Sequence, residues 1–81
     1  MKVTVRYFAA HKEATGVADE VLDVPDGTTV AELMEELMRQ HPDLVDLRRD
    51  TVISVNKGIG NNAISLKEGD DVALFPPISG G

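Results

Sequence analysis

The sequence contains no cysteine, and that absence removes several kinds of chemistry. Disulfides, cysteine nucleophiles and thiolate metal sites all require a thiol. The chain has 2 histidines, His11 before the main predicted helix and His41 at its end. Without a thiol to join them, we expect no metal site.

Aromatic residues and long apolar runs are also scarce. Aromatic residues make up 4% of the chain and hydrophobic residues 42%, so the core must be mainly aliphatic. No stretch approaches the ~18 apolar residues of a membrane span. Residues 1–6 alternate in hydropathy and lack the apolar run of a signal peptide. We therefore expect a cytoplasmic protein with no membrane partner.

Basic residues are outnumbered by acidic ones. The chain has 8 lysines and arginines against 14 aspartates and glutamates, for a net charge of −6. Such a surface is a poor partner for nucleic acid. It fits a basic protein partner, or it only keeps a small domain in solution, and both interpretations stay open. With 81 residues, the chain is long enough for one domain and too short for two.

Alternation of apolar and polar residues with a period of two predicts several strands. In the first of them, Val3, Val5 and Tyr7 share one face, whereas Phe8 falls on the other. The predicted strands span residues 2–8, 19–24, 51–56 and 72–75, with a short edge strand at 63–66. Polar residues 42–50 and the glycine- and asparagine-rich residues 57–62 are predicted to be connections.

The main predicted helix has a defined start and end. Thr29, followed three residues later by Glu32, forms a capping box. The apolar stripe that follows has helical spacing and consists of Val30, Leu33, Met34, Leu37 and Met38. The helix should end near His41, because Pro42 disfavours helical backbone in the residue before it.

The order of these elements predicts an α+β fold, the ubiquitin-like β-grasp. One main helix packs on one face of a mixed sheet of four to five strands, which buries its single apolar stripe. A shorter helical segment within residues 9–16 should end at Gly16. The expected domain covers residues 1–77, and residues 78–81 are expected to form a flexible C-terminal tail that ends in Gly-Gly.

The segment at residues 75–81 carries the clearest chemical signal. Pro76 and Pro77 stop the last strand and direct the chain away from the domain. Gly80 and Gly81 have no Cβ, so they fit a narrow channel in another protein. A carboxylate is a poor electrophile until it is activated, most simply as an acyl-adenylate formed with ATP. Attack by sulfur on that adenylate would leave a thiocarboxylate, which needs no cysteine on the carrier.

Strand alternation also predicts a surface beside this tail. If Val72 and Leu74 face the core, Phe75 faces outward, as Phe8 does. The first and last strands are neighbours in a β-grasp, so the two rings should lie together on an open sheet face. Such a pair favours a docking surface, and the alternative is that the rings only cover a small local cluster.

Four segments of the chain resemble one known family. They are residues 5–9 (Val-Arg-Tyr-Phe-Ala), 28–33 (Thr-Thr-Val-Ala-Glu-Leu), 55–56 (Val-Asn) and 68–81, which ends in Phe-Pro-Pro-Ile-Ser-Gly-Gly. The chain resembles the MoaD/ThiS group of ubiquitin-like sulfur carriers, and within that group the small subunits of molybdopterin synthase. The resemblance spans essentially the whole chain, and its last segment is the most specific part.

The resemblance implies a role for each part of the tail. An adenylating enzyme of the ubiquitin-activating type would use ATP on Gly81, next to Gly80, and a sulfur donor would then form the thiocarboxylate. The large subunit of molybdopterin synthase would receive the tail, and the sulfur would pass to a pterin precursor of the molybdenum or tungsten cofactor. The chain would bind no cofactor itself and would be a co-substrate. The residues implied to contact partners are Phe8, Ile59, Phe75, Pro76, Pro77, Ile78 and Ser79.

Other uses of an activated terminus stay open. Gly81 could be joined to a lysine of another protein, as in a ubiquitin-like modifier. The sulfur could instead go to a thiazole or to tRNA, although the tails of thiazole carriers usually lack the double proline. A binding module that uses only the sheet face is a further alternative.

Overall fold

A five-stranded sheet, two α-helices and a 3₁₀-helix make up residues 1–77, the part of the chain that the computed structural model describes. In chain order the elements are β1 (Lys2–Tyr7), α1 (Ala10–Thr15), β2 (Asp19–Asp23), α2 (Val30–Gln40), the 3₁₀-helix η1 (Pro42–Asp50), β3 (Val52–Val55), β4 (Gly58–Ile59) and β5 (Asp71–Phe75). None of the helices in this range is long and apolar enough to cross a membrane. The predicted tail residues Ile78, Ser79, Gly80 and Gly81 lie outside the described residues.

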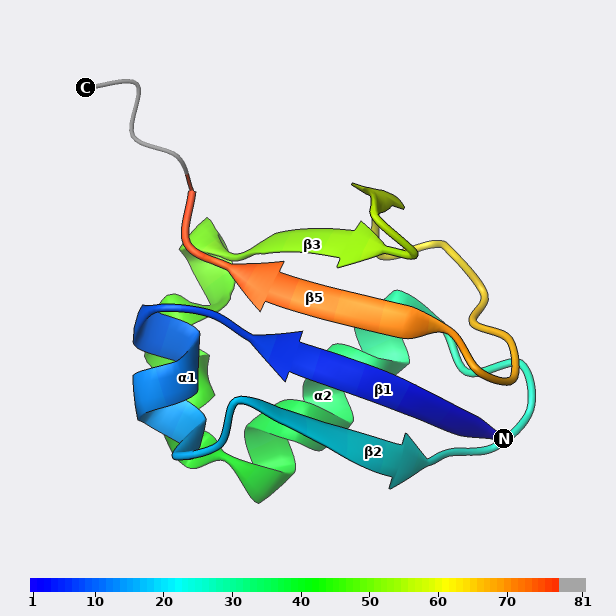
Figure 1. Cartoon of the computed structure of the whole chain (residues 1–81), viewed down its shortest axis with the longest axis horizontal. Helices are drawn as coiled ribbons and strands as arrows, with labels where there is room; N and C mark the ends of the chain where they lie inside the picture. Colours follow the sequence, from blue (N-terminus) through cyan, green and yellow to red (C-terminus); the bar gives the residue numbers. More distant parts are fainter. Residues whose placement is uncertain (78–81) are drawn as a thin grey trace.

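The strands are arranged in the order β2-β1-β5-β3-β4, so the first and last strands lie side by side in the middle of the sheet (Figure 1). β1 and β5 are parallel, with Val5 opposite Val72. The other neighbouring strands are antiparallel. This mixed sheet with one main helix confirms the predicted ubiquitin-like β-grasp.

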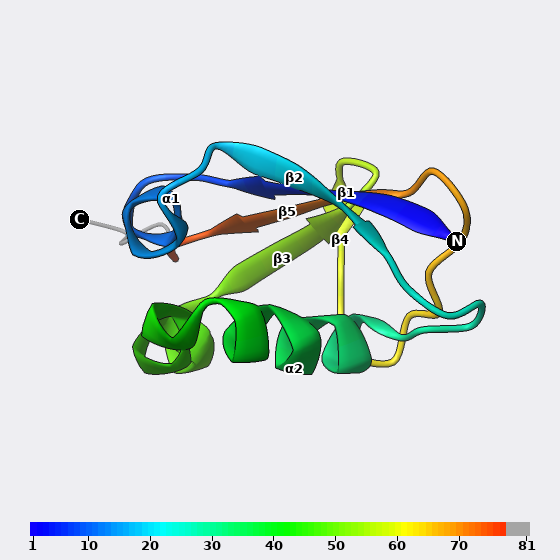
Figure 2. The same cartoon turned by 90° about the horizontal axis from the view of Figure 1, so that it is seen from below.

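Helix α2 covers one face of the sheet, and the other face is open within residues 1–77 (Figure 2). It begins at the predicted capping box, in which Thr29 Oγ1 accepts a hydrogen bond from the Glu32 amide at 3.2 Å. In return, Glu32 Oε1 accepts from the Thr29 amide at 2.9 Å. The helix ends as predicted at His41, whose amide donates to the Leu37 carbonyl at 2.7 Å.

The core lies between α2 and the covered face of the sheet. The buried cluster consists of Val3, Val5, Tyr7, Leu22, Val24, Val30, Leu33, Met34, Leu37, Leu44, Leu66, Val72 and Leu74. Alternation along the strands and the helical stripe predict most of these residues, and Met38 packs at the edge of the cluster. Because the core fills only one side of the sheet, outward-facing side chains on the other side are free to meet a partner.

Helix α1 matches the predicted short helix, and Gly16 ends it. Gly16 has a φ of 78°, and its amide donates to the Lys12 carbonyl at 2.8 Å. Glycine adopts this left-handed conformation without strain. Ala9, just before the helix, has a φ of 50°, which costs free energy in a residue with a Cβ. This strained residue directly follows Phe8.

The prediction of a short strand at residues 63–66 is wrong. Within residues 1–77, this segment forms only an isolated bridge between Ser65 and Thr29. The Ile64 carbonyl accepts from the Val30 amide at 2.9 Å, so the segment pairs with the start of α2 and not with the sheet. It satisfies a backbone donor of the first helical turn, which has no partner inside the helix.

Two predicted connections have regular structure. Gly58–Ile59, predicted as part of a loop, pair with β3 as the strand β4. Asn56 and Lys57 form the turn between β3 and β4, with φ of 51° and 71°. Positive φ at both positions is the pattern of a type I′ turn, which fits the twist of two antiparallel strands. The polar connection at 42–50 is the 3₁₀-helix η1, which buried Leu44 anchors to the core.

Candidate docking surface beside the C-terminal segment

The open face of the sheet carries several residues that the sequence singles out. One row across this face consists of Arg6 on β1, Ala73 on β5, Ser54 on β3 and Ile59 on β4. The adjacent row consists of Phe8, Phe75 and Val52. Side chains directly opposite one another share a face, so these two rows form one continuous surface.

Phe8 and Phe75 lie side by side, as the alternation predicts. Their ring centroids are 5.5 Å apart and their planes meet at 37°. The Phe8 amide donates to the Leu74 carbonyl at 3.2 Å, which extends the pairing of β1 and β5 by one residue. Phe8 is 45% exposed. An exposed aromatic pair on an uncovered sheet face is typical of protein docking surfaces.

Small side chains leave a hollow beside the aromatic pair. Ala73 lies opposite Arg6 on the open face, but it is only 9% exposed, since larger neighbours enclose it. Ala73 and Ser54 line a hollow of about 340 Å³, together with the rings of Phe8 and Phe75. A recess beside an exposed aromatic pair can accept an apolar side chain from a partner, the usual arrangement at the centre of an interface.

Charged groups line another part of the same hollow. The Arg6 Nε–H donates to both carboxylate oxygens of Asp71, at 2.9 and 3.0 Å. Hydrogen bonding and charge attraction from Asp71 raise the pKa of the Arg6 guanidinium, which therefore stays charged. Lys57 reaches the hollow from the β3–β4 turn and forms no salt bridge within residues 1–77. Its ammonium group is available to a carboxylate of a partner.

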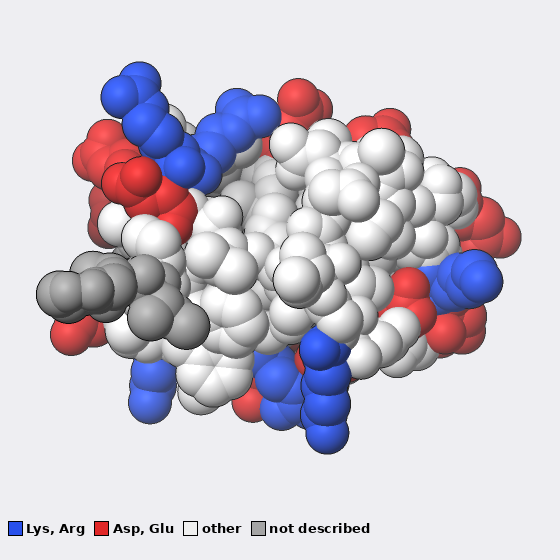
Figure 3. All heavy atoms as spheres, turned by 90° about the horizontal axis from the view of Figure 1, so that it is seen from above, with Lys and Arg blue, Asp and Glu red and all other residues white. Residues whose placement is uncertain are grey.

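A second hollow lies where the chain leaves the sheet. It measures about 730 Å³, and Val52, Phe75, Pro76 and Pro77 line it. Phe75 therefore borders both hollows. Figure 3 shows the edge of the molecule that carries β3 and β4, where uncharged residues occupy the middle and charged residues lie mostly around the margin. An uncharged centre inside a charged rim is the usual composition of a protein interface.

Ile59 lies on the same face but apart from the aromatic pair. It is 97% exposed on β4, and its register opposite Ser54 places it on the open side of the sheet. The other predicted contacts, Ile78 and Ser79, and the predicted reacting residues Gly80 and Gly81 lie outside the described residues. Their roles stay predictions.

The structure adds residues to this surface that the sequence pattern does not single out. They are Arg6, Val52, Ser54 and Asp71. The alternation already places Arg6 on the face of Phe8, two residues away in the chain. It does not give the register between β1 and β5, and that register brings Asp71 beside Arg6.

The two histidines lie in separate hydrogen-bonded pairs. His11 Nε2 is 2.7 Å from Thr51 Oγ1, and His41 Nε2 is 2.7 Å from a carboxylate oxygen of Glu20. Among residues 1–77, no group of three or more His, Cys, Asp or Glu side chains is placed to hold a metal ion.

Comparisons with known proteins find relatives over the whole length of the chain. The human molybdopterin synthase sulfur carrier subunit is 37% identical over 83 residues, a match that covers 99% of this chain and 94% of that protein. A solved structure from Pyrococcus furiosus, described as molybdopterin converting factor, subunit 1, is 34% identical with a TM-score of 0.88, and covers 96% of this chain and 99% of that one. SAMP1 from Haloferax volcanii is 26% identical with a TM-score of 0.86, and each chain is covered over 100% of its length.

The model of the ThiS family matches residues 5–81. The matched range contains the sheet from Val5 of β1 onward, the aromatic pair and the segment that follows Pro77. Because this range is nearly the whole chain, the protein belongs to the ThiS family.

Proposed function

We propose that the chain is the sulfur carrier subunit of molybdopterin synthase. The observation that carries the proposal is the full-length similarity to the human sulfur carrier subunit, at 37% identity over 83 residues. The open sheet face supports it, since a carrier must dock on each enzyme that acts on its terminus. The proposed location is the cytoplasm.

The reacting group in this proposal is the carboxylate of Gly81. A separate adenylating enzyme of the ubiquitin-activating type joins this carboxylate to AMP from ATP and releases pyrophosphate. A sulfur nucleophile at the oxidation level of sulfide, delivered by a sulfur donor, attacks the carbonyl carbon and displaces AMP. The resulting thiocarboxylate donates its sulfur to a pterin precursor, and water then hydrolyses the acyl–sulfur bond and restores the carboxylate.

The chain itself supplies binding, and its partners supply the catalytic groups. Phe8 and Phe75 would contact the large subunit of molybdopterin synthase, with a partner side chain in the hollow beside them. Pro76 and Pro77 restrict the backbone just after β5 and so limit the directions in which the terminal residues extend. The adenylating enzyme would use the same face at a different step, because both enzymes act on one terminus. The chain binds no cofactor of its own in this scheme.

Intact-mass measurement of the protein from its native host tests the proposal. We expect a species that is heavier by the mass difference between sulfur and oxygen, with the change located at Gly81 by fragmentation. A variant without Gly81 should lack this species and should not restore molybdopterin synthesis in cells without the native chain. The proposal is wrong if the native protein carries no thiocarboxylate and the deletion has no effect on molybdopterin synthesis.

A protein modifier is the second candidate function. It is favoured by the similarity to SAMP1, the small archaeal modifier protein 1 of Haloferax volcanii, at a TM-score of 0.86. A lysine amine of a target protein would then attack the same adenylate, form an isopeptide bond and release AMP. Conjugates that resist boiling and reduction, and that disappear when Gly81 is deleted, would support this function. Their absence from the native host would exclude it there.

A further inference from the structure

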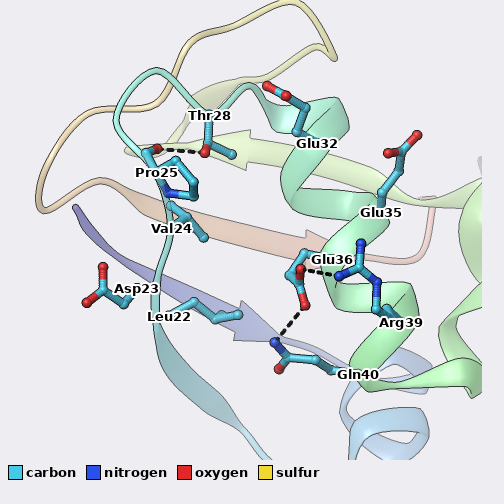
Figure 4. Close-up of a pocket in the computed structure, with 10 residues that line it drawn as sticks. All are labelled: Leu22, Asp23, Val24, Pro25, Thr28, Glu32, Glu35, Glu36, Arg39 and Gln40. Atoms are coloured by element: carbon cyan, nitrogen blue, oxygen red, sulfur yellow. Dashed lines mark hydrogen bonds and ion pairs between the residues drawn. The ribbon is translucent and has the colours of Figure 1, made fainter.

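A groove separates strand β2 from helix α2, and it lies at the opposite edge of the sheet from β4 (Figure 4). The groove measures about 420 Å³. Leu22, Val24 and Pro25 line it from the side of β2, and Glu32, Glu35, Glu36, Arg39 and Gln40 line it from α2. None of these residues belongs to the docking surface around Phe8 and Phe75.

The hydrogen bonds between β1 and β2 leave alternate residues of β2 with outward-pointing backbone groups. The Val24 amide donates to the Met1 carbonyl at 2.8 Å, and the Met1 amine donates to the Val24 carbonyl at 2.7 Å. Such doubly bonded pairs recur at every second position of an antiparallel ladder. The backbone N–H and C=O groups of Leu22 and Glu20 therefore also point toward β1. The residues whose N–H and C=O groups point away from β1 are therefore Asp19, Val21 and Asp23.

This edge of the sheet is uncovered in the part of the chain that the structure describes. Within residues 1–77, β1 is the only strand that pairs with β2. The Val21 side chain, in the middle of the edge, is 64% exposed. An unpaired edge with an exposed apolar side chain is a template for pairing with another extended chain.

The charges around this edge determine what kind of chain fits it. Asp19 and Asp23 flank Val21 on β2, and Glu32 and Glu35 are exposed on α2. Arg39, the only lysine or arginine that lines the groove, already donates to Glu36 at 3.0 Å. A second copy of this chain would set its own β2 carboxylates against these, and like charges directly opposite in a sheet are destabilising. A segment that carries lysine and arginine would instead be attracted.

We infer that the edge of β2 and the adjoining groove bind a basic, extended segment of a partner protein as an added antiparallel strand. The segment places an apolar residue opposite Val21 and basic residues opposite Asp19 and Asp23. The partner residues between these three positions direct their side chains toward α2. Their aliphatic stems lie over Leu22, and their cationic ends reach Glu35.

A short synthetic peptide tests the inference on the intact, isotope-labelled protein. The probe has the sequence lysine-arginine-valine-arginine-lysine and is blocked at both ends. We expect its addition to shift the amide signals of Val21, Asp23 and Glu35 in nuclear magnetic resonance spectra, with those of Phe8 and Phe75 unchanged. The same peptide with glutamate at the four basic positions is expected to cause no shift.

N-methylation separates strand addition from charge attraction alone. In the antiparallel arrangement, the valine and both lysines of the peptide direct their amides toward β2, and both arginines direct theirs away. Methylation of the valine amide should weaken binding roughly fivefold, the effect of one net hydrogen bond. Methylation of one arginine amide, at the same charge, should leave binding unchanged. Equal binding by the two methylated peptides would show that no strand is added.

Protein variants provide a second test. Val21→Pro removes an outward N–H at an edge position that tolerates proline, and it should weaken binding roughly fivefold. Val21→Thr keeps the N–H and the branched shape, so it is the matched control.

Glu35→Gln should weaken binding, whereas Glu13→Gln on α1 should not. If Val21→Pro does not fold, the methylated peptides still distinguish strand addition from charge attraction. Peptide-induced shifts at Phe8 and Phe75, or a dimer formed through β2, would overturn the inference.

Discussion

At the scale of single residues, Phe75 contacts Phe8 and borders two hollows on the open face. Its side chain points away from the buried cluster on the other side of the sheet. Substitutions here should therefore separate binding from folding, which substitutions in the core cannot do.

Under the proposed function, Phe75→Ala should weaken binding to the large subunit of molybdopterin synthase by about 2 kcal/mol, as for an aromatic residue at the centre of an interface. The midpoint of urea unfolding should change little. Isothermal titration calorimetry measures the first quantity and circular dichroism the second. Val45→Ala, at an exposed apolar residue on η1, is the matched control. A folded Phe75→Ala variant with normal binding would contradict the role of this residue.

His11 is a second residue whose surroundings predict a measurable effect. The Thr51 hydroxyl donates to the Leu47 carbonyl at 2.7 Å, so it accepts from the Nε2–H of His11. The Nδ1 atom of His11 is buried and has no hydrogen-bond partner within the described residues. Burial lowers the pKa of His11, because the surroundings disfavour its charged form.

The stability of the protein should therefore fall as the pH decreases below the ordinary histidine pKa of 6.5. Below that value, the unfolded chain binds a proton at His11 before the folded chain does, so protonation favours unfolding. Urea unfolding at about pH 7.5 and about pH 5.5 measures the loss. His11→Gln, which cannot titrate, should show a smaller loss over the same range. An equal loss in both proteins would assign the effect to other groups.

At the scale of elements, the hairpin of β3 and β4 holds Lys57 at a φ of 71°. This conformation costs roughly 1–2 kcal/mol in a residue with a Cβ. The strained turn directs Lys57 toward the hollow beside Phe8 and Phe75. A side chain maintained in a strained turn beside an exposed aromatic pair is consistent with a binding role.

Lys57→Gly should raise the free energy of unfolding by about 1 kcal/mol, since glycine relieves the strain. It should also weaken partner binding if the ammonium group meets a carboxylate. Chemical denaturation and calorimetry measure the two effects. Asn56→Gly is the contrasting variant, and it should be destabilised, because the Asn56 side chain donates to Asp70 Oδ1 at 3.0 Å and accepts from the Asp71 amide at 2.9 Å. A destabilised Lys57→Gly variant would show that the turn differs from type I′.

Local signals explain which elements could be predicted from the sequence. The capping box at Thr29, the stop at Gly16 and the strand alternation each depend on residues within a few positions of one another. β4 could not be predicted in this way, since its turn has Asn56 and Lys57 where the usual signal is Asn-Gly. The segment around Ser65 has a strand-like composition, but it pairs with the residues before α2, a contact between distant parts of the chain.

The same distinction holds for the candidate site. Alternation alone places Phe8 and Phe75 outward, and the β-grasp order makes them neighbours. The ion pair of Arg6 and Asp71 depends on the register of two strands that are far apart in sequence. Ile59 was predicted as a partner contact only from the family resemblance, and the structure places it on the same face as Phe8 and Phe75.

At the scale of the whole molecule, 81 residues supply one small core. A domain of this length has a free energy of unfolding of about 4–12 kcal/mol. This free energy of unfolding is small, so a single core substitution should remove much of it.

Leu37→Ala should lower the free energy of unfolding by about 2–5 kcal/mol, because Leu37 is fully buried between α2 and the sheet. Urea unfolding measures this loss. In contrast to Phe75→Ala, partner binding by the fraction that remains folded should be unchanged. A loss below about 1 kcal/mol would show that the core around Leu37 repacks to fill the space.

The central position of β5 has a consequence for protein synthesis. β5 pairs with β1 on one side and with β3 on the other, yet it is the last strand of the sheet to leave the ribosome. A chain that stops before Asp71 lacks the middle of the sheet, and with it the neighbour that holds Phe8 in place. Products that end before Asp71 would therefore fail to display the docking surface, and a partner that recognises this surface would select chains in which β5 is complete.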